Sequence, residues 1–291
     1  MRIDRLIRRI RETGNPSALG LDTKISYVPE ALARAHTEPA DAIYAFNAAL
    51  LEALSDIIPC VKVQAAYYEA LGTAGVECFR RTIERAKALG CAVIADAKRG
   101  DIGSTAEAYS AAYLRDDAPF PADFLTVNPY FGTDGMSPFI ADCAASGKGI
   151  FALAKTSNPS GTEFQDVILH DGRPMYELVA EKIAEWGEGL IGQEGFSSVG
   201  AVVGATYPRQ GAALRRKMPR TFFLLPGYGA QGASAEHLAA CFDERGEGAV
   251  VAASRSMICA HIKRGTDDFA GAAREEAIRM REEIRNALRP A

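Results

Sequence analysis

Two acidic residues and one lysine lie close together in the segment 92–109. Residues 92–95 are small and apolar, as is typical of a buried parallel strand. Asp96 and Lys98 come directly after them, and Asp101 follows three residues later. Residues two apart in an extended strand share a face, so we expect Asp96 and Lys98 to lie within reach of each other. Charged groups held this close are costly to desolvate, and their titrations are coupled. Such a group is more typical of an active site than of a purely structural ion pair. A surface ion pair at a strand-to-helix turn is the alternative.

An ammonium group between carboxylates can act where negative charge develops. The opposite charges favour the protonated form of Lys98. Such a group can stabilise developing negative charge and then donate a proton. The alternative chemistry is a Schiff base on the same lysine, as in an aldolase, although that role favours a lysine with fewer acids around it.

Eight short apolar runs recur along the chain, and segments with helical periodicity separate them, such as 40–54, 66–89, 176–191 and 269–288. This alternation is typical of parallel strand pairing with right-handed crossovers. We therefore predict an α/β protein whose strand–helix units close into a (β/α)8 TIM barrel, with an additional N-terminal helix that caps its bottom. The predicted strands are 17–22, 60–65, 91–98, 124–130, 149–156, 197–204, 221–227 and 248–254.

An open doubly wound sheet is the competing architecture. It would carry a glycine-rich dinucleotide loop after the first strand, and residues 23–26 form no such loop. No Pro/Ser-rich linker or shift in composition divides the chain, so we predict one domain over 1–291. The longest irregular stretch, 157–174, follows the fifth predicted strand, where a barrel places its active site.

Composition excludes several classes of protein. The 291 residues are 48% hydrophobic, enough for a large core, and their net charge of −4 argues against nucleic acid as the main partner. No apolar run approaches the roughly 20 residues of a membrane span. The arginine-rich start contains acids and no serine-rich tract, unlike a transit peptide. The cysteines and histidines lack disulfide-framework or metal-site spacing, so we expect reduced thiols, no metal and a cytoplasmic protein.

If the barrel closes, the residues that end its strands meet at one mouth. The loops after strands seven and eight often bind phosphate in barrels, and Arg255 can add a bidentate contact. We therefore predict a phosphorylated small-molecule ligand. The residues brought to the mouth would be Asp22, Lys62, Asp96, Lys98, Asn128, Lys155, Ser157, Gly204, the loop 226–232 and residues 254–256.

Taken singly, several of these residues have a structural explanation. Asp22 is equally well explained as a cap, Lys62 as a partner in a buried ion pair, and Arg255 as a surface arginine. The glycines of 227–232 are sufficient for a simple turn. Only their convergence on the same end of so many strands favours a binding site.

The segment 96–105, DAKRGDIGST, resembles the D-x-K-x-x-D signature of the orotidine 5'-phosphate decarboxylase family, and the resemblance covers nearly the whole chain. The other matching motifs are G-L-D ending at Asp22, V-K-V with Lys62, T-S-N-P-x-G with Ser157, P-G-x-G-A-Q-G with Gln231, and Arg255 after the last strand. The resemblance implies decarboxylation of orotidine 5'-phosphate to uridine 5'-phosphate in pyrimidine biosynthesis, without metal or cofactor.

The resemblance also implies residue roles. Lys98 would be the proton donor, and Asp96 and Asp101 its acidic neighbours. In the family, Asp101 and Thr105 reach into the neighbouring subunit's site, which implies a homodimer with shared active sites. The predicted substrate-binding residues are Asp22 and Lys62 for the ribose hydroxyls, Ser157 for the pyrimidine, Gln231 and Arg255 for the phosphate, and also Thr105, Asn128, Pro226, Gly227 and Ser254.

Two features depart from the commoner family pattern. Ser254 stands where glycine is usual, which leaves open whether the backbone contacts phosphate there. The chain is also longer than compact members, partly in 157–174 and around 187–195, which places it in the longer bacterial-type branch. Three other functions stay open: an aldolase, a magnesium-dependent sugar-phosphate decarboxylase, and a non-catalytic sensor of a phosphorylated ligand.

Overall fold

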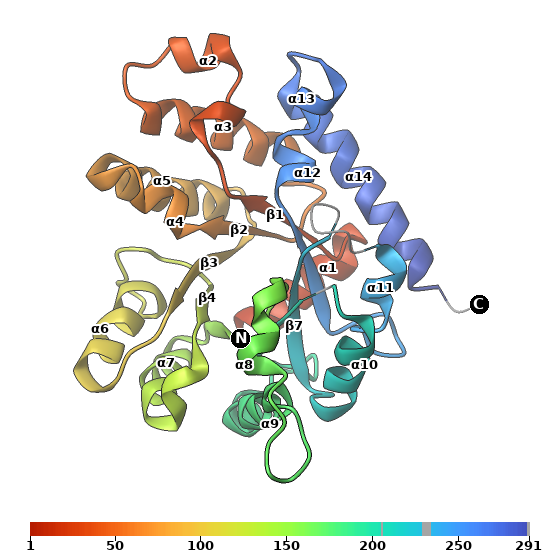
Figure 1. Ribbon diagram of the computed structural model, residues 1–291. Helices are drawn as coiled ribbons and strands as arrows, with labels where there is room; N and C mark the ends of the chain where they lie inside the picture. Colours follow the sequence, from red (N-terminus) through yellow and green to blue (C-terminus); the bar gives the residue numbers. More distant parts are fainter. Residues whose placement is uncertain (205, 229–233, 290–291) are drawn as a thin grey trace.

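The strands close into a parallel barrel in sequence order, as the computed structural model shows for residues 1–204, 206–228 and 234–289 (Figure 1). Each strand pairs in parallel with the next, and β1 pairs with β8 to close the ring. The predicted (β/α)8 architecture is therefore confirmed, and the open doubly wound sheet is excluded. The strands are β1 (Ser17–Leu21), β2 (Cys60–Gln64), β3 (Ala92–Arg99), β4 (Phe124–Val127), β5 (Gly149–Lys155), β6 (Ser197–Val203), β7 (Thr221–Pro226) and β8 (Ala249–Ala253).

Helices surround the barrel, and short ones follow several strand ends at its mouth (Figure 1). The longer helices are α1 (Arg2–Thr13), α3 (Pro39–Leu54), α5 (Gly72–Ala88), α6 (Gly103–Leu114), α7 (Gly132–Ser146), α9 (Met175–Gly187), α10 (Pro208–Lys217) and α14 (Phe269–Ala287). The shorter ones are α2 (Glu30–Arg34), α4 (Ala65–Glu69), α8 (Thr162–Gln165), α11 (Ala235–Ala239), α12 (Arg255–Ile258) and α13 (Ala260–Arg264). The 3-10 turns are η1 (Ile25–Tyr27), η2 (Pro129–Phe131), η3 (Pro159–Gly161) and η4 (Glu188–Leu190).

Two elements differ from the sequence-based expectation. The helix expected over 66–89 is divided into α4 and α5, and Gly72 at the junction has a left-handed φ of 66°. The strand expected over 124–130 ends at Val127 because Pro129, which has no backbone N–H, begins a 3-10 turn.

The barrel interior changes character from bottom to mouth. At the bottom, the rings of Phe124 and Phe151 pack 5.4 Å apart between centroids, and Ile3, Leu6 and Ile7 of α1 belong to the same buried apolar cluster. The N-terminal helix therefore caps the bottom, as predicted. Because side chains alternate along a strand, the next inward-facing residues lie one layer nearer the mouth, where those of β2 to β4 are polar and those of β5 to β8 are apolar.

The cysteines are packing residues. None is disulfide-bonded, and all are buried except Cys259, which is partly buried. Burial raises the pKa of the Cys78 and Cys91 thiols to about 11, so both stay protonated at neutral pH. Within the described ranges, no helix combines the length and apolar character that crossing a membrane requires. The single domain over 1–291 stays a prediction.

Candidate active site

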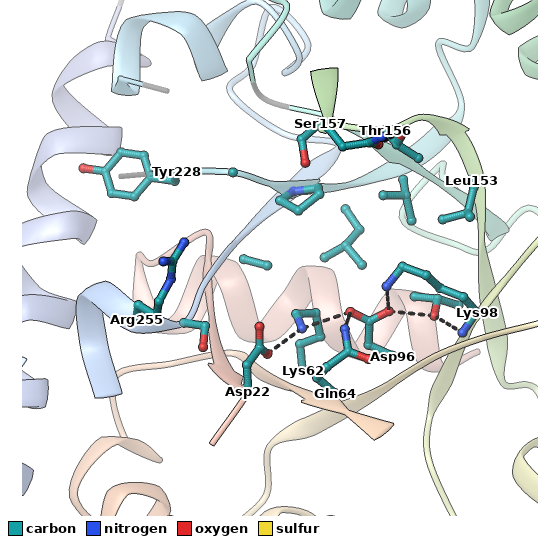
Figure 2. A pocket seen from close by; sticks show the side chains of 18 residues that line it. Asp22, Lys62, Gln64, Asp96, Lys98, Leu153, Thr156, Ser157, Tyr228 and Arg255 are labelled. Atoms are coloured by element: carbon teal, nitrogen blue, oxygen red, sulfur yellow. Dashed lines mark hydrogen bonds and ion pairs between the residues drawn. The ribbon is translucent and has the colours of Figure 1, made fainter. Parts of the chain in front are cut away.

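A cavity of about 420 Å³ opens at the carboxyl ends of the strands, and every strand or the residues just after it contribute to its lining. The sequence-predicted residues that line it are Asp22, Lys62, Asp96, Lys98, Ser157, Pro226, Gly227, Ser254 and Arg255. Figure 2 shows Arg255 and Tyr228 at one end of the cavity and Lys98 at the other, with Asp22 and Lys62 between them. The cavity therefore joins the predicted anion-binding arginine to the predicted proton donor.

Four charged side chains of alternating sign form a chain along this cavity (Figure 2). Lys62 Nζ lies 2.9 Å from Asp22 Oδ1 and 3.0 Å from Asp96 Oδ2. Lys98 Nζ lies 2.6 Å from Asp96 Oδ1. Each carboxylate thus has an ammonium neighbour, and Asp96 links the two lysines.

Asp96 is the centre of this chain, and both of its carboxylate oxygens accept two hydrogen bonds or ion pairs. Lys62 and Gln64 Nε2 lie 3.0 and 2.9 Å from Oδ2, and Lys98 and Thr126 Oγ1 lie 2.6 and 2.9 Å from Oδ1. Burial alone would raise the pKa of Asp96, but the two neighbouring ammonium groups outweigh burial and hold this pKa well below its usual range. Asp96 is therefore a fixed anion at neutral pH.

The two lysines differ in environment. The Lys62 side chain is 8% exposed and lies between two carboxylates. Burial alone would lower the pKa of Lys62, yet the charges of Asp96 and Asp22 raise it above its ordinary value. The Lys98 side chain is 46% exposed, and within the described ranges Asp96 is the only group to which its ammonium donates. Lys98 therefore has N–H bonds available to a ligand in the cavity.

Asp96 and Lys98 meet at a bulge in β3, and the regular alternation assumed from the sequence is not what brings them together. The pairing of β3 with β4 shifts register between Ala95 and Arg99. Within the described ranges, Lys98 is the only non-glycine residue with a positive φ, at 47°. The expected contact is present, but the physical reason given for it was wrong.

The opposite end of the cavity contains the groups predicted to bind phosphate. Ser254 has φ −114°, so the backbone there does not require the glycine that is usual in the family. Space for its side chain comes from β1, because a Cβ on Gly20 would lie 2.8 Å from Ser254 Cβ. Gly227, with φ 110°, and Arg255 complete this end, whereas Gln231 lies outside the described residues.

Several predicted residues do not line this cavity, among them Asp101, Thr105, Asn128, Gly204 and Ser256. Asp101 accepts a hydrogen bond of 2.8 Å from the N–H of Ile102, and Thr105 is exposed on α6. Asn128 lines a neighbouring cavity and accepts a 3.1 Å hydrogen bond from the N–H of Tyr130. Within the described ranges of this one chain, Asp101 forms no ion pair, so Lys98 lies beside one acid and not between two.

The segment 157–174, expected to be irregular, contains η3, α8 and an antiparallel bridge between residues 168 and 174. Side chains attach it to the end of β5. Gln165 accepts from the N–H of Thr156 and donates to its hydroxyl, at 3.0 and 2.7 Å. Lys155, which the sequence placed at the mouth, does not line the cavity and is instead 1% exposed, with its ammonium 2.7 Å from Asp166.

Sequence reasoning missed several residues that line the cavity. They are Gln64, Thr126, Leu153, Thr156, Asn158, Val202, Leu224 and Ala252. Gln64 and Thr126 lie two residues from Lys62 and Asn128, so strand alternation could have identified them as inward-facing. The apolar ones had no distinguishing signal, because the same residue types also fill a barrel interior.

The side chains that line the cavity are poorly suited to bind a metal ion. In the described part of the chain, no three or more His, Cys, Asp and Glu side chains are grouped so that they could hold a metal ion. The oxygens of Asp96, the most buried acid of the cavity, already accept from two ammonium groups, an amide and a hydroxyl. A carboxylate has about four acceptor positions, so none is left for a metal.

Comparisons with known proteins agree on one family. The model described as "Orotidine 5'-phosphate decarboxylase / HUMPS family" matches residues 38–258. Two proteins named orotidine 5'-phosphate decarboxylase, from Clostridium acetobutylicum and Clostridium novyi, are 42% and 41% identical to this chain, covering 99% and 97% of it and 100% and 98% of their own lengths. A Streptomyces avermitilis crystal structure that carries this name provisionally has a TM-score of 0.84 and 35% identity, covering 98% of this chain and 95% of its own.

Proposed function

Because the chain belongs to the orotidine 5'-phosphate decarboxylase family, we propose that its barrel cavity binds orotidine 5'-phosphate with the phosphate at Arg255 and the C6 carboxylate near Lys98. The chain is a carboxy-lyase that converts orotidine 5'-phosphate to uridine 5'-phosphate in pyrimidine biosynthesis. The aldolase, sugar-phosphate decarboxylase and sensor alternatives have no support from these relatives. The geometry of the site, a cytoplasmic location and a homodimer are the parts that we propose.

The single observation that carries the proposed mechanism is the chain of alternating charges that ends at Lys98 in the same cavity as Arg255. Loss of CO2 leaves a carbanion at C6 whose lone pair lies in the ring plane, where the ring π system cannot delocalise it. Many decarboxylases use a coenzyme as an electron sink. Here a fixed ammonium supplies the stabilising charge and then protonates C6.

Lys98 is a better proton donor than Lys62 because of their surroundings. Deprotonated Lys62 would leave two carboxylates, Asp22 and Asp96, without a shared cation in a buried site. Lys98 contacts one carboxylate, and Asp96 keeps the cation of Lys62 after Lys98 has given up its proton. Lys62 therefore serves as the permanent counter-ion, and Asp22 and Lys62 remain available to the ribose hydroxyls.

Binding energy from parts of the substrate far from the reacting carboxylate must add to the stabilisation that the Lys98–Asp96 ion pair provides. Loss of CO2 without an electron sink requires a barrier reduction near the upper end of what enzymes supply, about 23 kcal/mol, which one charge cannot provide. Arg255 binds the phosphate at the far end of the cavity, and that binding energy can hold the reacting carboxylate against Asp96 and Lys98. Ser157 and Thr156, at the end of β5, line the same cavity, and we expect them to contact the pyrimidine.

The experiment replaces Lys98 by Ala and follows conversion of orotidine 5'-phosphate by its ultraviolet absorbance, with and without a chelator. We expect turnover to collapse while uridine 5'-phosphate still binds, because Arg255 and Asp22 are unchanged. Lys263→Ala, an exposed lysine on α13, is the matched control and should behave as wild type. Retained turnover in Lys98→Ala would show that another group donates the proton, and loss of activity with chelator would show that a metal takes part.

We also propose a homodimer in which each chain completes the other's site. In one chain, Asp101 lies outside the cavity, and large apolar side chains beside it are exposed: Ile102 by 55%, Tyr130 by 78% and Phe131 by 44%. An exposed apolar patch of this kind is typical of a protein–protein interface. A second copy docked on this patch would cover it and bring the partner's Asp101 toward Lys98.

Mixing two inactive variants tests the shared site. Lys98→Ala and Asp101→Ala homodimers should each be inactive. Random reassortment of equal amounts gives heterodimers in half of the molecules, and one of their two sites contains neither substitution, so about a quarter of wild-type activity should return. A monomer in sedimentation experiments, or no recovery after verified subunit exchange, would contradict the shared site while leaving the decarboxylase function intact.

A further inference from the structure

Thr126 is the single residue of β4 that lies opposite the bulge of β3. The two strands pair at positions 95 and 125 and again at positions 99 and 127. Three residues of β3, 96–98, therefore face one residue of β4. The bulge leaves backbone groups of β3 without their regular ladder partners, so something other than the β4 backbone must bind them.

The Thr126 hydroxyl binds both ends of the bulge. It accepts a hydrogen bond from the backbone N–H of Lys98 at 2.9 Å and donates one to Asp96 Oδ1, also at 2.9 Å. These directions are unambiguous, because an amide N–H can only donate and an ionised carboxylate can only accept. Asp96 Oδ1 in turn accepts from Lys98 Nζ at 2.6 Å. One hydroxyl thus connects the backbone of Lys98 to the carboxylate that orients its ammonium.

We propose that Thr126 is a positioning residue for the proton donor. Its hydroxyl holds Lys98 in the left-handed backbone conformation, φ 47°, that directs the side chain back toward Asp96. Strained backbone of this kind persists only where the surroundings hold it. This inference rests on the proposed role of Lys98, and it makes Ser or Thr the residue types that position 126 requires, because a short side chain must both accept and donate.

The test compares Thr126→Val with Thr126→Ser. Valine has nearly the same shape but removes both hydrogen bonds, so the ammonium loses its fixed direction, and a misplacement on the order of 1 Å lowers kcat by about a hundredfold. We expect the KM for orotidine 5'-phosphate to change little, because Asp22 and Arg255 are untouched. Thr126→Ser keeps the hydroxyl and should retain most of the turnover.

A buried threonine elsewhere provides the matched control. Thr82 on α5 is buried, and its hydroxyl donates to the carbonyl of Cys78 at 2.7 Å, away from the cavity. Thr82→Val should lower the melting temperature without lowering kcat. Should Thr126→Val fail to fold, Thr126→Cys takes its place with the same expectation, because a thiol donates and accepts only weakly.

A second measurement isolates proton transfer from loss of CO2. In D2O, a donor at C6 also exchanges the C6 proton of uridine 5'-phosphate by the reverse of the same step, and nuclear magnetic resonance follows this exchange. We expect exchange and kcat to fall together in Thr126→Val. Wild-type turnover in Thr126→Val, or equal losses in the Ser and Val variants, would overturn the inference. If Lys98→Ala is inactive in the same experiment, the proposed role of Lys98 as proton donor survives that outcome, and an active Lys98→Ala would refute that role itself.

Discussion

Asp96 and Asp101, the two acids of the D-x-K-x-x-D motif, lie in different environments, so replacing each by Asn tests the same chemical change in both. Asp96 has 6% exposure and accepts from four donors, whereas Asp101 lies outside the cavity and accepts from a backbone N–H. Replacing either by Asn keeps the shape and removes the charge. We expect Asp96→Asn to lower both stability and turnover, and Asp101→Asn to lower turnover alone.

The magnitude for Asp96→Asn follows from its geometry. At the 3.0 Å separation from Lys62, an effective dielectric constant of about 20 gives a gross attraction of about 5–6 kcal/mol. Lys62 keeps Asp22 at 2.9 Å, and the neutral amide is cheaper to bury, so only part of this attraction is lost. The amide also turns its NH2 toward either Lys62 and Gln64 or Lys98 and Thr126, and all four of these groups donate to Asp96 in the wild type. We expect a loss of about 3 kcal/mol in the free energy of unfolding, the low end for breaking a buried pair.

The stability difference between wild type and Asp96→Asn depends on pH. Folding lowers the pKa of Asp96, so its carboxylate stabilises the fold above its unfolded pKa of about 3.9, and this contribution is lost as the pH falls through the lower folded value. The difference between wild type and Asp96→Asn should therefore be complete at pH 7 and shrink only below about pH 4.

Urea unfolding followed by circular dichroism at one fixed subunit concentration measures these free energies, and the ultraviolet assay measures turnover. Asp101→Asn should stay within about 0.5 kcal/mol of wild type, as is usual for exposed positions. A loss below about 1 kcal/mol in Asp96→Asn would refute the claim that Asp96 binds two buried or half-buried cations. Full turnover in Asp101→Asn would refute the shared site.

Three further substitutions probe the surroundings of the cavity. Asp166→Asn leaves the ammonium of Lys155, 1% exposed, without its carboxylate, so we expect a loss of about 3 kcal/mol in urea unfolding, and an unchanged midpoint would contradict the pairing. Gly20→Ala places a Cβ 2.8 Å from Ser254 Cβ and should lower stability by about 1–3 kcal/mol; adding Ser254→Gly should recover part of that loss, and strictly additive losses would show that the two residues do not compete for space. Arg255→Ala should lower kcat/KM by at least about 2 kcal/mol, roughly thirtyfold, mainly by raising KM, and an unchanged KM in steady-state kinetics would remove Arg255 from the phosphate site.

The barrel and its bottom cap were predictable because both depend on periodic patterns. Apolar runs separated by helical segments specify the strand order, and the spacing of Ile3, Leu6 and Ile7 specifies which face of α1 is buried. The positions of Lys62 and Asp96 at the mouth follow from the same alternation. Patterns of this kind predict which faces of strands and helices are buried, but they do not predict which side chains pair with each other.

Other features depend on interactions that a pattern does not encode. Lys155 ends a strand much as Asp22 does, yet its long side chain does not line the cavity and pairs instead with Asp166 of the segment 157–174. The bulge at Lys98 requires a hydroxyl from another strand, and no local feature of β3 indicates it. Asp101 belongs by motif to the site, but one chain alone does not place it there.

The order of the charges explains how one ammonium can take the role that a coenzyme has in other decarboxylases. Proton donation by Lys98 removes one positive charge from the cavity, which would leave a lone buried carboxylate if Asp96 had no other cation. Lys62 remains 3.0 Å away, so Asp96 keeps a counter-ion through the whole cycle. Asp22 on the other side of Lys62 raises the pKa of that lysine further, which prevents Lys62 from becoming the donor itself. Because the Asp22–Lys62 pair keeps Lys62 protonated, proton donation is left to Lys98, the lysine that a substrate can reach.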